Sequence, residues 1–205
     1  MARSTSAILT ELSQLAATQG GFLTAAQATA AGITWQALNR LAKRGFLERE
    51  ERGLYRLSHL PIGENAELWK ALLWPALDRS DGVRAVLCYG TALSLYDVST
   101  INPKKTDVAV PRAVRIRRRT PPPPGLELHR KSYPPEDVTT VQGLPATTLF
   151  RTLADLIARK GALQFVDEAL ESPRTRSLLT SKEFDTLQAM RALDQRALTV
   201  LTGVS

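Results

Sequence analysis

Apolar residues recur at helical spacing near the start of the chain. Ile8, Leu12 and Leu15 lie on one side of a helix over residues 6–18, with polar residues on the opposite side. A Gly-Gly pair follows and ends this pattern. The first element is therefore predicted to be an amphipathic helix.

Two short helices are predicted next, separated by a glycine. Thr24 and Gln27 have the spacing of a capping box, in which each side chain hydrogen-bonds the backbone of the other, and they open a helix over about 24–31. Gly32 supplies the turn, and the third helix runs over about 34–44. Two short helices around such a turn are typical of a helix-turn-helix.

The third helix has two chemically different sides. Trp35, Leu38, Leu41 and Ala42 are predicted to form the apolar side that faces the core. The other side carries amides, which suit adenine edges, and cations, which suit guanine or phosphate. The residues of this helix predicted to bind DNA are Thr34, Gln36, Asn39, Arg40, Lys43 and Arg44.

A hairpin is predicted directly after the third helix. Residues 46–49 and 54–57 are two short runs on either side of a turn, 50–53, that contains glycine, and together they indicate a two-stranded hairpin. Three helices and a hairpin in this order predict a winged helix-turn-helix. The hairpin adds three cations to the predicted DNA-binding set, Arg49, Arg52 and Arg56, although Glu48, Glu50 and Glu51 beside them would repel phosphate if they faced it.

The remaining two thirds of the chain mix strand and helix patterns. A buried strand is predicted over 83–89, a helix that begins after a glycine over 91–96, and further strands over 106–110 and 126–130. From residue 144 onward the apolar spacing is helical. Strand, glycine and helix in succession indicate an α/β layer.

These patterns predict an α+β protein of two domains. The N-terminal winged helix-turn-helix spans residues 1–60, and a mixed α/β domain with a helical C-terminal end spans 64–205. The second domain is predicted to open with a helix over 64–79 that Pro75 kinks, because proline cannot continue the helical hydrogen-bond ladder.

The charge balance favours a polyanionic partner. Lys and Arg outnumber Asp and Glu by 27 to 20, for a net charge of +7. Part of this excess is a predicted strand over 112–119, which is either a solvated basic edge or a second face for a polyanion or protein partner. Its cations are Arg112, Arg115, Arg117, Arg118 and Arg119.

Composition also excludes several classes of protein. The single cysteine, Cys88, cannot form an internal disulfide and lies in an apolar run, so a buried thiol in a reducing compartment is expected. No apolar run approaches the ~18 to 20 residues that cross a bilayer, and the N-terminus lacks the apolar core of a signal peptide. We expect a cytoplasmic protein with no membrane partner.

Four segments of the chain are distinctive as a set: GFLTAAQA at 21–28, LAKRGFL at 41–47, GLYRL at 53–57 and VQGLPATTLFRTLADL at 141–156. Together they resemble the AbiEi family of antitoxins from type IV toxin–antitoxin systems. The resemblance implies a bacterial antitoxin whose N-terminal domain binds the promoter of its own operon. It also implies that the C-terminal domain counteracts a nucleotidyltransferase-like toxin.

The last of these segments needs no catalytic explanation. Thr147 or Thr148 can cap the helix that follows. Arg151 and Asp155 lie four residues apart on it, where an ion pair is worth only ~0.2 to 0.5 kcal/mol.

A nucleotidyltransferase signature is faintly similar to residues 89–95 and 106–110. That chemistry needs two carboxylates on one face of a strand to hold metal ions, but Asp107 is followed at the second position by Ala109. An inactive relative or coincidence explains the similarity better than catalysis. With two histidines and one cysteine in the chain, no catalytic residue, metal site or cofactor is predicted.

The leading hypothesis is therefore an antitoxin that is also a transcriptional autorepressor. Its expected partners are DNA of its own promoter and a cognate nucleotidyltransferase-like toxin. The alternative is a winged-helix transcription regulator whose α/β domain senses a ligand or another partner, without a toxin. A degenerate nucleotidyltransferase is a minor alternative.

Overall fold

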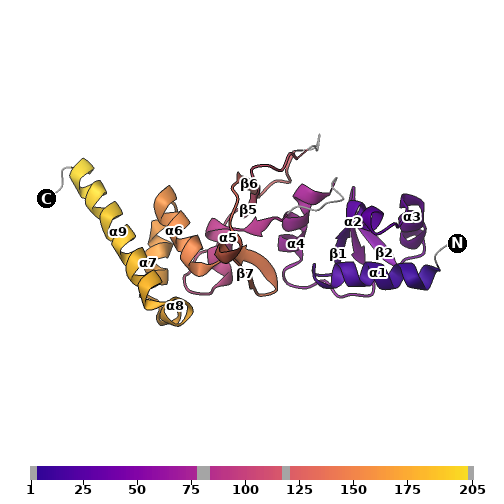
Figure 1. The fold of residues 1–205 in the computed structure, drawn as a ribbon, viewed down its shortest axis with the longest axis horizontal. Coiled ribbons are helices and arrows are strands. Elements are labelled where there is room, and N and C mark those ends of the chain that lie inside the picture. The colour runs from indigo at the N-terminus through magenta and orange to yellow at the C-terminus, as the bar shows by residue number, and fades with distance from the viewer. Residues whose placement is uncertain (1–3, 78–83, 117–120, 203–205) are drawn as a thin grey trace. The chain divides into compact units, whose positions relative to one another are not determined.

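The computed structural model describes residues 4–77, 84–116 and 121–202, with side chains as far as residue 195. The chain divides into two compact units (Figure 1). The first comprises Met1–Ala85 with Val110–Pro124, and the second comprises Val86–Ala109 with Gly125–Ser205. The two units are described in turn.

Three helices open the first unit, each begun by a hydroxyl cap. They are α1 (Thr5–Ala17), α2 (Ala25–Ala30) and α3 (Trp35–Lys43). The capping box predicted at Thr24 is confirmed, since Thr24 accepts from the Gln27 amide at 3.0 Å and the Gln27 side chain accepts from the Thr24 amide at 2.8 Å. Thr34 caps α3 in the same way by accepting from the Ala37 amide.

The predicted hairpin is confirmed as part of a small sheet. Its strands are β2 (Leu47–Glu51) and β3 (Leu54–Leu57), and a short strand β1 (Phe22–Thr24) pairs with the free edge of β3. The order is β1-β3-β2, with both pairings antiparallel. Strand β1 was not predicted, because three residues are too few to show an alternating pattern.

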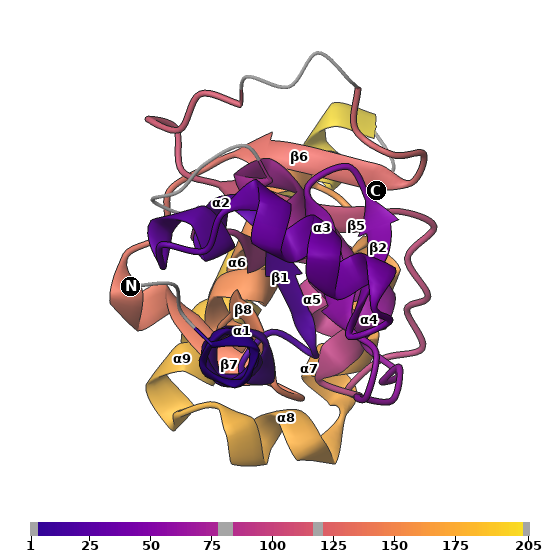
Figure 2. The same ribbon diagram turned by 90° about the vertical axis from the view of Figure 1, so that its right-hand side faces the viewer.

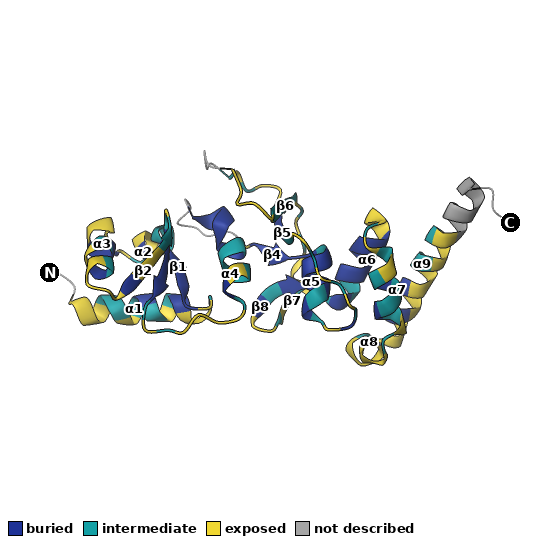
Figure 3. Ribbon diagram, turned by 180° about the vertical axis from the view of Figure 1, so that it is seen from behind, coloured by how far each residue is buried: buried dark blue, intermediate teal, exposed yellow. Residues whose placement is uncertain are grey.

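The helices and this sheet bury one continuous apolar core. All three helices, β1 and the hairpin contribute to it, and the buried sides of these elements are dark blue in Figure 3. The core residues are Leu12, Ala16, Leu23, Ala28, Ile33, Ala37, Leu38, Leu41, Leu47, Tyr55 and Leu57. The first unit is a winged helix-turn-helix, as predicted.

A fourth helix extends the first unit beyond the winged helix. Helix α4 (Ala66–Leu73) passes into a 3-10 turn, η1 (Trp74–Ala76), so the helix predicted over 64–79 is interrupted next to Pro75 rather than continued through a kink. Helix α4 packs on β1, and its Lys70 ammonium lies 5.8 Å from the centre of the Phe22 ring.

Lys70 also connects α4 to the hairpin through a carboxylate. Its ammonium lies 2.9 Å from a Glu50 oxygen of β2. The hydrogen bond from Lys70 holds the pKa of Glu50 below its usual value, with a further contribution from Arg56 and some opposition from burial.

The second unit contains a five-stranded mixed sheet. Its strands are β4 (Val86–Leu87), β5 (Thr106–Val110), β6 (Leu126–Arg130), β7 (Val138–Val141) and β8 (Leu144–Thr147). They lie in the order β6-β5-β4-β8-β7, in which β4 and β8 are parallel while β4 with β5, and β7 with β8, are antiparallel.

The helices of this unit pack against one another. They are α5 (Tyr89–Leu95), α6 (Leu149–Arg159), α7 (Leu163–Glu171), α8 (Pro173–Leu178) and α9 (Ser181–Thr202), with a 3-10 turn η2 (Pro135–Asp137) before β7. Helix α6 is central, because α5, α7 and α9 all contact it. Its apolar side holds the core around Leu153, and the predicted helical C-terminal end is confirmed.

Two of the predicted elements of this unit are wrong in extent or kind. The strand predicted over 83–89 is confined among the described residues to β4, since Tyr89 already begins α5. The segment expected to turn helical at residue 144 first forms β8, with Pro145 inside the strand. Pairing with β4 and β7 favours a strand there over the local helical pattern.

The strand predicted over 112–119 is also wrong where the structure describes it. Residues 112–116 form a turn and irregular backbone, and Arg117, Arg118 and Arg119 lie outside the described residues. Strand β5 ends immediately before Pro111, which has no amide to donate to a ladder. The position beside β5 is taken instead by β6.

The docking of α4 leads to a prediction about Gly20. This glycine has φ +61°, and a Cβ there would lie 2.3 Å from the Trp69 ring of α4, whereas Gly45 has φ +77° and open space around it. We expect Gly45→Ala to lower the free energy of unfolding by ~1 kcal/mol and Gly20→Ala by ~2 to 4 kcal/mol, because the second adds overpacking to backbone strain. Urea denaturation of both variants measures the difference, and equal losses would contradict the close packing of α4.

The Glu50 carboxylate leads to a prediction about pH. Because its pKa is lower in the folded state than in the unfolded chain, its stabilisation is complete above the unfolded pKa and is lost as the pH falls through the folded one. We expect Glu50→Gln to cost ~1 kcal/mol at pH 7 and progressively less in acid. Glu67→Gln is the control, because Glu67 shares Lys70 but is 84% exposed. A cost for Glu50→Gln that does not change with pH, measured by urea denaturation, would refute this role.

Candidate nucleic-acid interface

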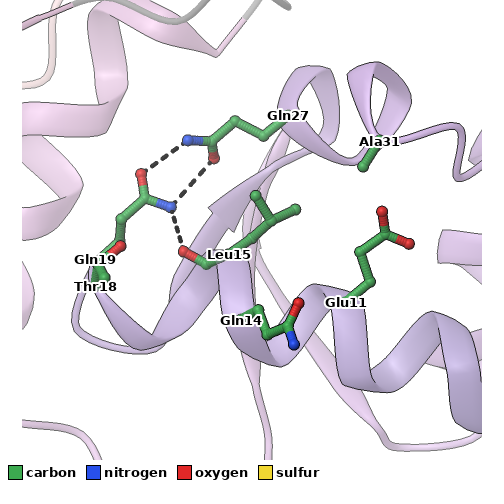
Figure 4. A pocket seen from close by; sticks show the side chains of 7 residues that line it. All are labelled: Glu11, Gln14, Leu15, Thr18, Gln19, Gln27 and Ala31. Carbon is green, nitrogen blue, oxygen red and sulfur yellow. Dashed lines mark hydrogen bonds between the residues drawn. The ribbon is translucent and has the colours of Figure 1, made fainter.

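The helix-turn-helix is held in place by a pair of glutamine amides. Gln19, just after α1, and Gln27 of α2 face each other, and the Gln27 amide nitrogen donates to the Gln19 oxygen at 2.8 Å (Figure 4). The Gln19 amide nitrogen also donates to the Leu15 carbonyl at 3.0 Å. These amides border a polar hollow of about 420 Å³, and because they bond to each other they fix α1 against α2.

Helix α3 lies beside α2 as the second helix of the motif (Figure 2). Ala37, Leu38 and Leu41 are buried, and Ile33, which precedes the Thr34 cap, lies with Leu38 in the core as a hydrophobic staple. The rest of the helix is largely at the surface. Among the predicted DNA-binding residues of this segment, Thr34, Gln36, Arg40, Lys43 and Arg44 are exposed and Asn39 is half-buried.

Trp35 is the residue of α3 that the sequence pattern places wrongly. It was expected in the core, but 64% of it is exposed. At about 100° per residue, Trp35 lies roughly 40° from Asn39 and 80° from Lys43 around the helix, and more than 100° from the middle of the buried stripe. It therefore belongs to the outer side of α3, with the polar residues.

The three hairpin arginines that were predicted to bind DNA differ in their exposure to solvent. Arg49 and Arg52 are exposed, but Arg56 is only 6% exposed and lies within the unit. Its guanidinium donates to Glu48, to Glu50 at 3.2 Å and to the Leu60 carbonyl at 2.8 Å. Arg56 is therefore withdrawn from the predicted DNA-binding set, since it is committed to holding the hairpin.

The same contacts pair two of the three hairpin glutamates that were expected to repel phosphate. Glu48 pairs with Arg56, and Glu50 pairs with both Arg56 and Lys70. Arg40, Lys43, Arg44, Arg49 and Arg52, in contrast, have no hydrogen-bonded or ion-paired side chain among the described residues. Positive charge is thus left available at the surface of α3 and of the hairpin.

The basic segment after β5 offers less than the sequence suggested. Arg112 and Arg115 are exposed, but they stand on a turn and on irregular backbone rather than on one face of a strand. Arg112 also has a partner within the structure. The described part of this segment therefore does not form the regular basic face that was predicted.

The ion pair predicted between Arg151 and Asp155 is confirmed, and it belongs to a larger buried network. Asp155 of α6 is buried, and besides Arg151 its carboxylate accepts from the Lys131 ammonium and the Tyr133 hydroxyl, each at 2.6 Å. Burial raises the pKa of Tyr133, so this hydroxyl remains a neutral donor. The Asp155 network links α6 to the chain that follows β6, because those donors come from residues far away in sequence.

No helix within the described residues is long and apolar enough to span a membrane.

Comparisons with known proteins identify both parts of the chain. Residues 11–58 match the family described as "Transcriptional regulator, AbiEi antitoxin", and residues 85–197 match "AbiEi antitoxin C-terminal domain". No curated protein sequence matches the chain.

A solved structure, the RV2827C protein from Mycobacterium tuberculosis, aligns with 97% of this chain and 82% of its own, at 16% identity and a TM-score of 0.47. The family matches do not depend on that structure. Because the C-terminal family match alone covers more than half of the chain, and the winged helix carries the matching regulator family, the protein belongs to the AbiEi antitoxin family.

Proposed function

We propose that the protein is an antitoxin that represses transcription of its own operon by binding promoter DNA through α3 and the hairpin. The observation that carries this proposal is the outer side of α3, where amides and unpaired cations stand together opposite a fully buried apolar stripe. Such a helix can enter the major groove, in which both base edges and phosphates are within reach.

The residues divide by the part of DNA that each would contact. Gln36 and Asn39 carry amides that can pair with adenine edges, so they would read sequence. Lys43 and Arg44 lie at the C-terminal end of α3 and would neutralise phosphates. Arg49 and Arg52 on the hairpin would add phosphate contacts beside the groove.

The antitoxin activity is proposed for the second unit. Support comes from the match of residues 85–197 to the antitoxin C-terminal domain. We propose that this unit counteracts a cognate nucleotidyltransferase-like toxin. Because the proposed DNA contacts all lie in the first unit, loss of DNA binding should leave rescue from the toxin intact.

The proposal predicts a specific salt dependence for Lys43→Ala and Arg44→Ala. We expect each variant to weaken binding to the promoter and to random DNA alike, and to reduce the slope of log K against log salt by about 0.9, because one phosphate contact is lost. Fluorescence anisotropy with DNA from upstream of the gene measures both quantities. Lys182→Ala is the control, since Lys182 is an exposed cation on α9.

The double variant Lys43→Ala/Arg44→Ala separates the two proposed activities in cells. We expect it to derepress a reporter under the promoter and still to rescue growth from the toxin. Unchanged salt slopes would reject the DNA interface. Failure of the wild-type chain to rescue growth would reject the antitoxin half of the proposal.

Base reading predicts a different pattern for Gln36→Ala and Trp35→Ala. Each should weaken promoter binding by about 1 to 3 kcal/mol and random DNA much less, because an amide and an apolar ring can contact an adenine edge and a thymine methyl. Neither should lower the melting temperature, since both side chains are exposed. Ile62→Ala is the control, as Ile62 is 66% exposed but lies outside α3 and the hairpin. Equal losses on both DNAs would refute base reading.

A further inference from the structure

Two adjacent strands of the second unit bring three metal-binding side chains together. Asp107 is on β5, and Glu127 and His129 are two residues apart on β6, so the last two share one face of that strand. The His129 Nε2 atom lies 2.8 Å from an Asp107 oxygen. One ligand atom from each of the three residues lies within 4.8 Å of the others.

These separations suit a shared ion. Ligands bound to one metal at about 2.1 Å are roughly 3 to 4 Å apart, so the Asp107 and His129 atoms, now 2.8 Å apart, would have to separate slightly and Glu127 would have to make only a small movement. The set combines one imidazole nitrogen with two carboxylates. Imidazole suits Zn²⁺ and related transition metals, and carboxylates suit Mn²⁺ as well.

Two of the three residues face a pocket through which an ion can enter. Asp107 and Glu127 line a pocket of about 410 Å³ that Tyr89, Lys105 and Arg159 also border. The Asp107 and His129 side chains are 15% and 13% exposed, so the ion would be partly shielded from water. The His129 ring is oriented by the Tyr89 ring, which meets it edge-on at 4.7 Å between centroids.

Two cations of the pocket would compete with a metal ion for Glu127. Lys105 donates to one of its oxygens at 3.0 Å, and Arg159 approaches the other at 3.5 Å. The Lys105 hydrogen bond lowers the pKa of Glu127, which keeps the carboxylate ionised. Because Lys105 is 65% exposed, it can turn to solvent when an ion arrives.

We propose that Asp107, Glu127 and His129 form a binding site for a divalent transition-metal ion, Zn²⁺ or Mn²⁺, at the wall of this pocket. The site is independent of the proposed DNA interface, since all of its residues belong to the second unit. Ala109 of β5 cannot supply a second carboxylate beside Asp107, but Glu127 of the neighbouring strand β6 can.

The two histidines of the chain allow a direct test in the full-length protein. Nitrogen-detected NMR of the imidazoles gives separate signals for His129 and for His59, which is exposed in the first unit. We expect Zn²⁺ to shift the His129 nitrogens in a saturable way while the His59 signals stay in place. Equal shifts of both histidines, or no shift of His129, would overturn the proposal.

Two variants are expected to change the affinity for Zn²⁺ in opposite directions. By isothermal titration calorimetry with ZnCl₂, we expect Asp107→Asn to weaken binding at least about 10-fold and Lys105→Gln to tighten it about 3- to 10-fold, because the second removes a competing charge. Glu136→Gln, which alters an exposed acid outside the cluster, should bind as wild type. If Asp107→Asn fails to fold, Lys105→Gln decides alone, and unchanged or weaker binding there would refute the site.

Discussion

The burial of Leu38 and Leu41 decides how the first unit can act. Both side chains are almost wholly inside the core, and leaving either in water would cost ~1.5 to 3 kcal/mol. With this stripe fixed, the rotation of α3 about its axis is fixed as well. Every other side chain of the helix is then directed by its angle from the stripe, and the amides and cations are held at the surface.

The hairpin depends on a second constraint, which is how its charges are divided. Arg56 is inside and is matched by two carboxylates, whereas Arg49 and Arg52 are outside and have no partner among the described residues. A buried guanidinium without its acids would be costly, so the glutamates are needed for folding. Glu48 and Glu50, which the sequence alone suggests would repel phosphate, thus stabilise the hairpin. Through Lys70, Glu50 also helps to dock α4.

In the second unit, the pairing of β5 with β6 determines which side chains lie close together. It places Asp107 beside His129 and Glu127, although residues 111–125 separate β5 from β6 in the sequence. Strand β6 therefore lies at the edge of the sheet beside β5, and the segment predicted as a basic edge strand over 112–119 does not. Helix α6 and the residues after β6 are then joined by the Asp155 carboxylate, which would be an uncompensated buried charge without its donors.

The sequence by itself determined the elements whose signals are local. Residues only a few positions apart encode the caps at Thr24 and Thr34, the helical spacing of Leu38 and Leu41, and the interruption of the helix beside Pro75. These features could therefore be identified without the fold. The winged helix, the outer side of α3 apart from Trp35, and the family resemblance follow from such signals.

Tertiary structure decided whatever depends on a distant partner. An arginine in an alternating strand looks the same whether it faces water, as Arg49 does, or two glutamates, as Arg56 does. Pro145 is in a strand because β4 and β7 flank it, and Trp35 is exposed because the core stripe lies on another side of the helix. The grouping of Asp107, Glu127 and His129 likewise needed the β5–β6 pairing, since no local spacing encodes which strands lie side by side.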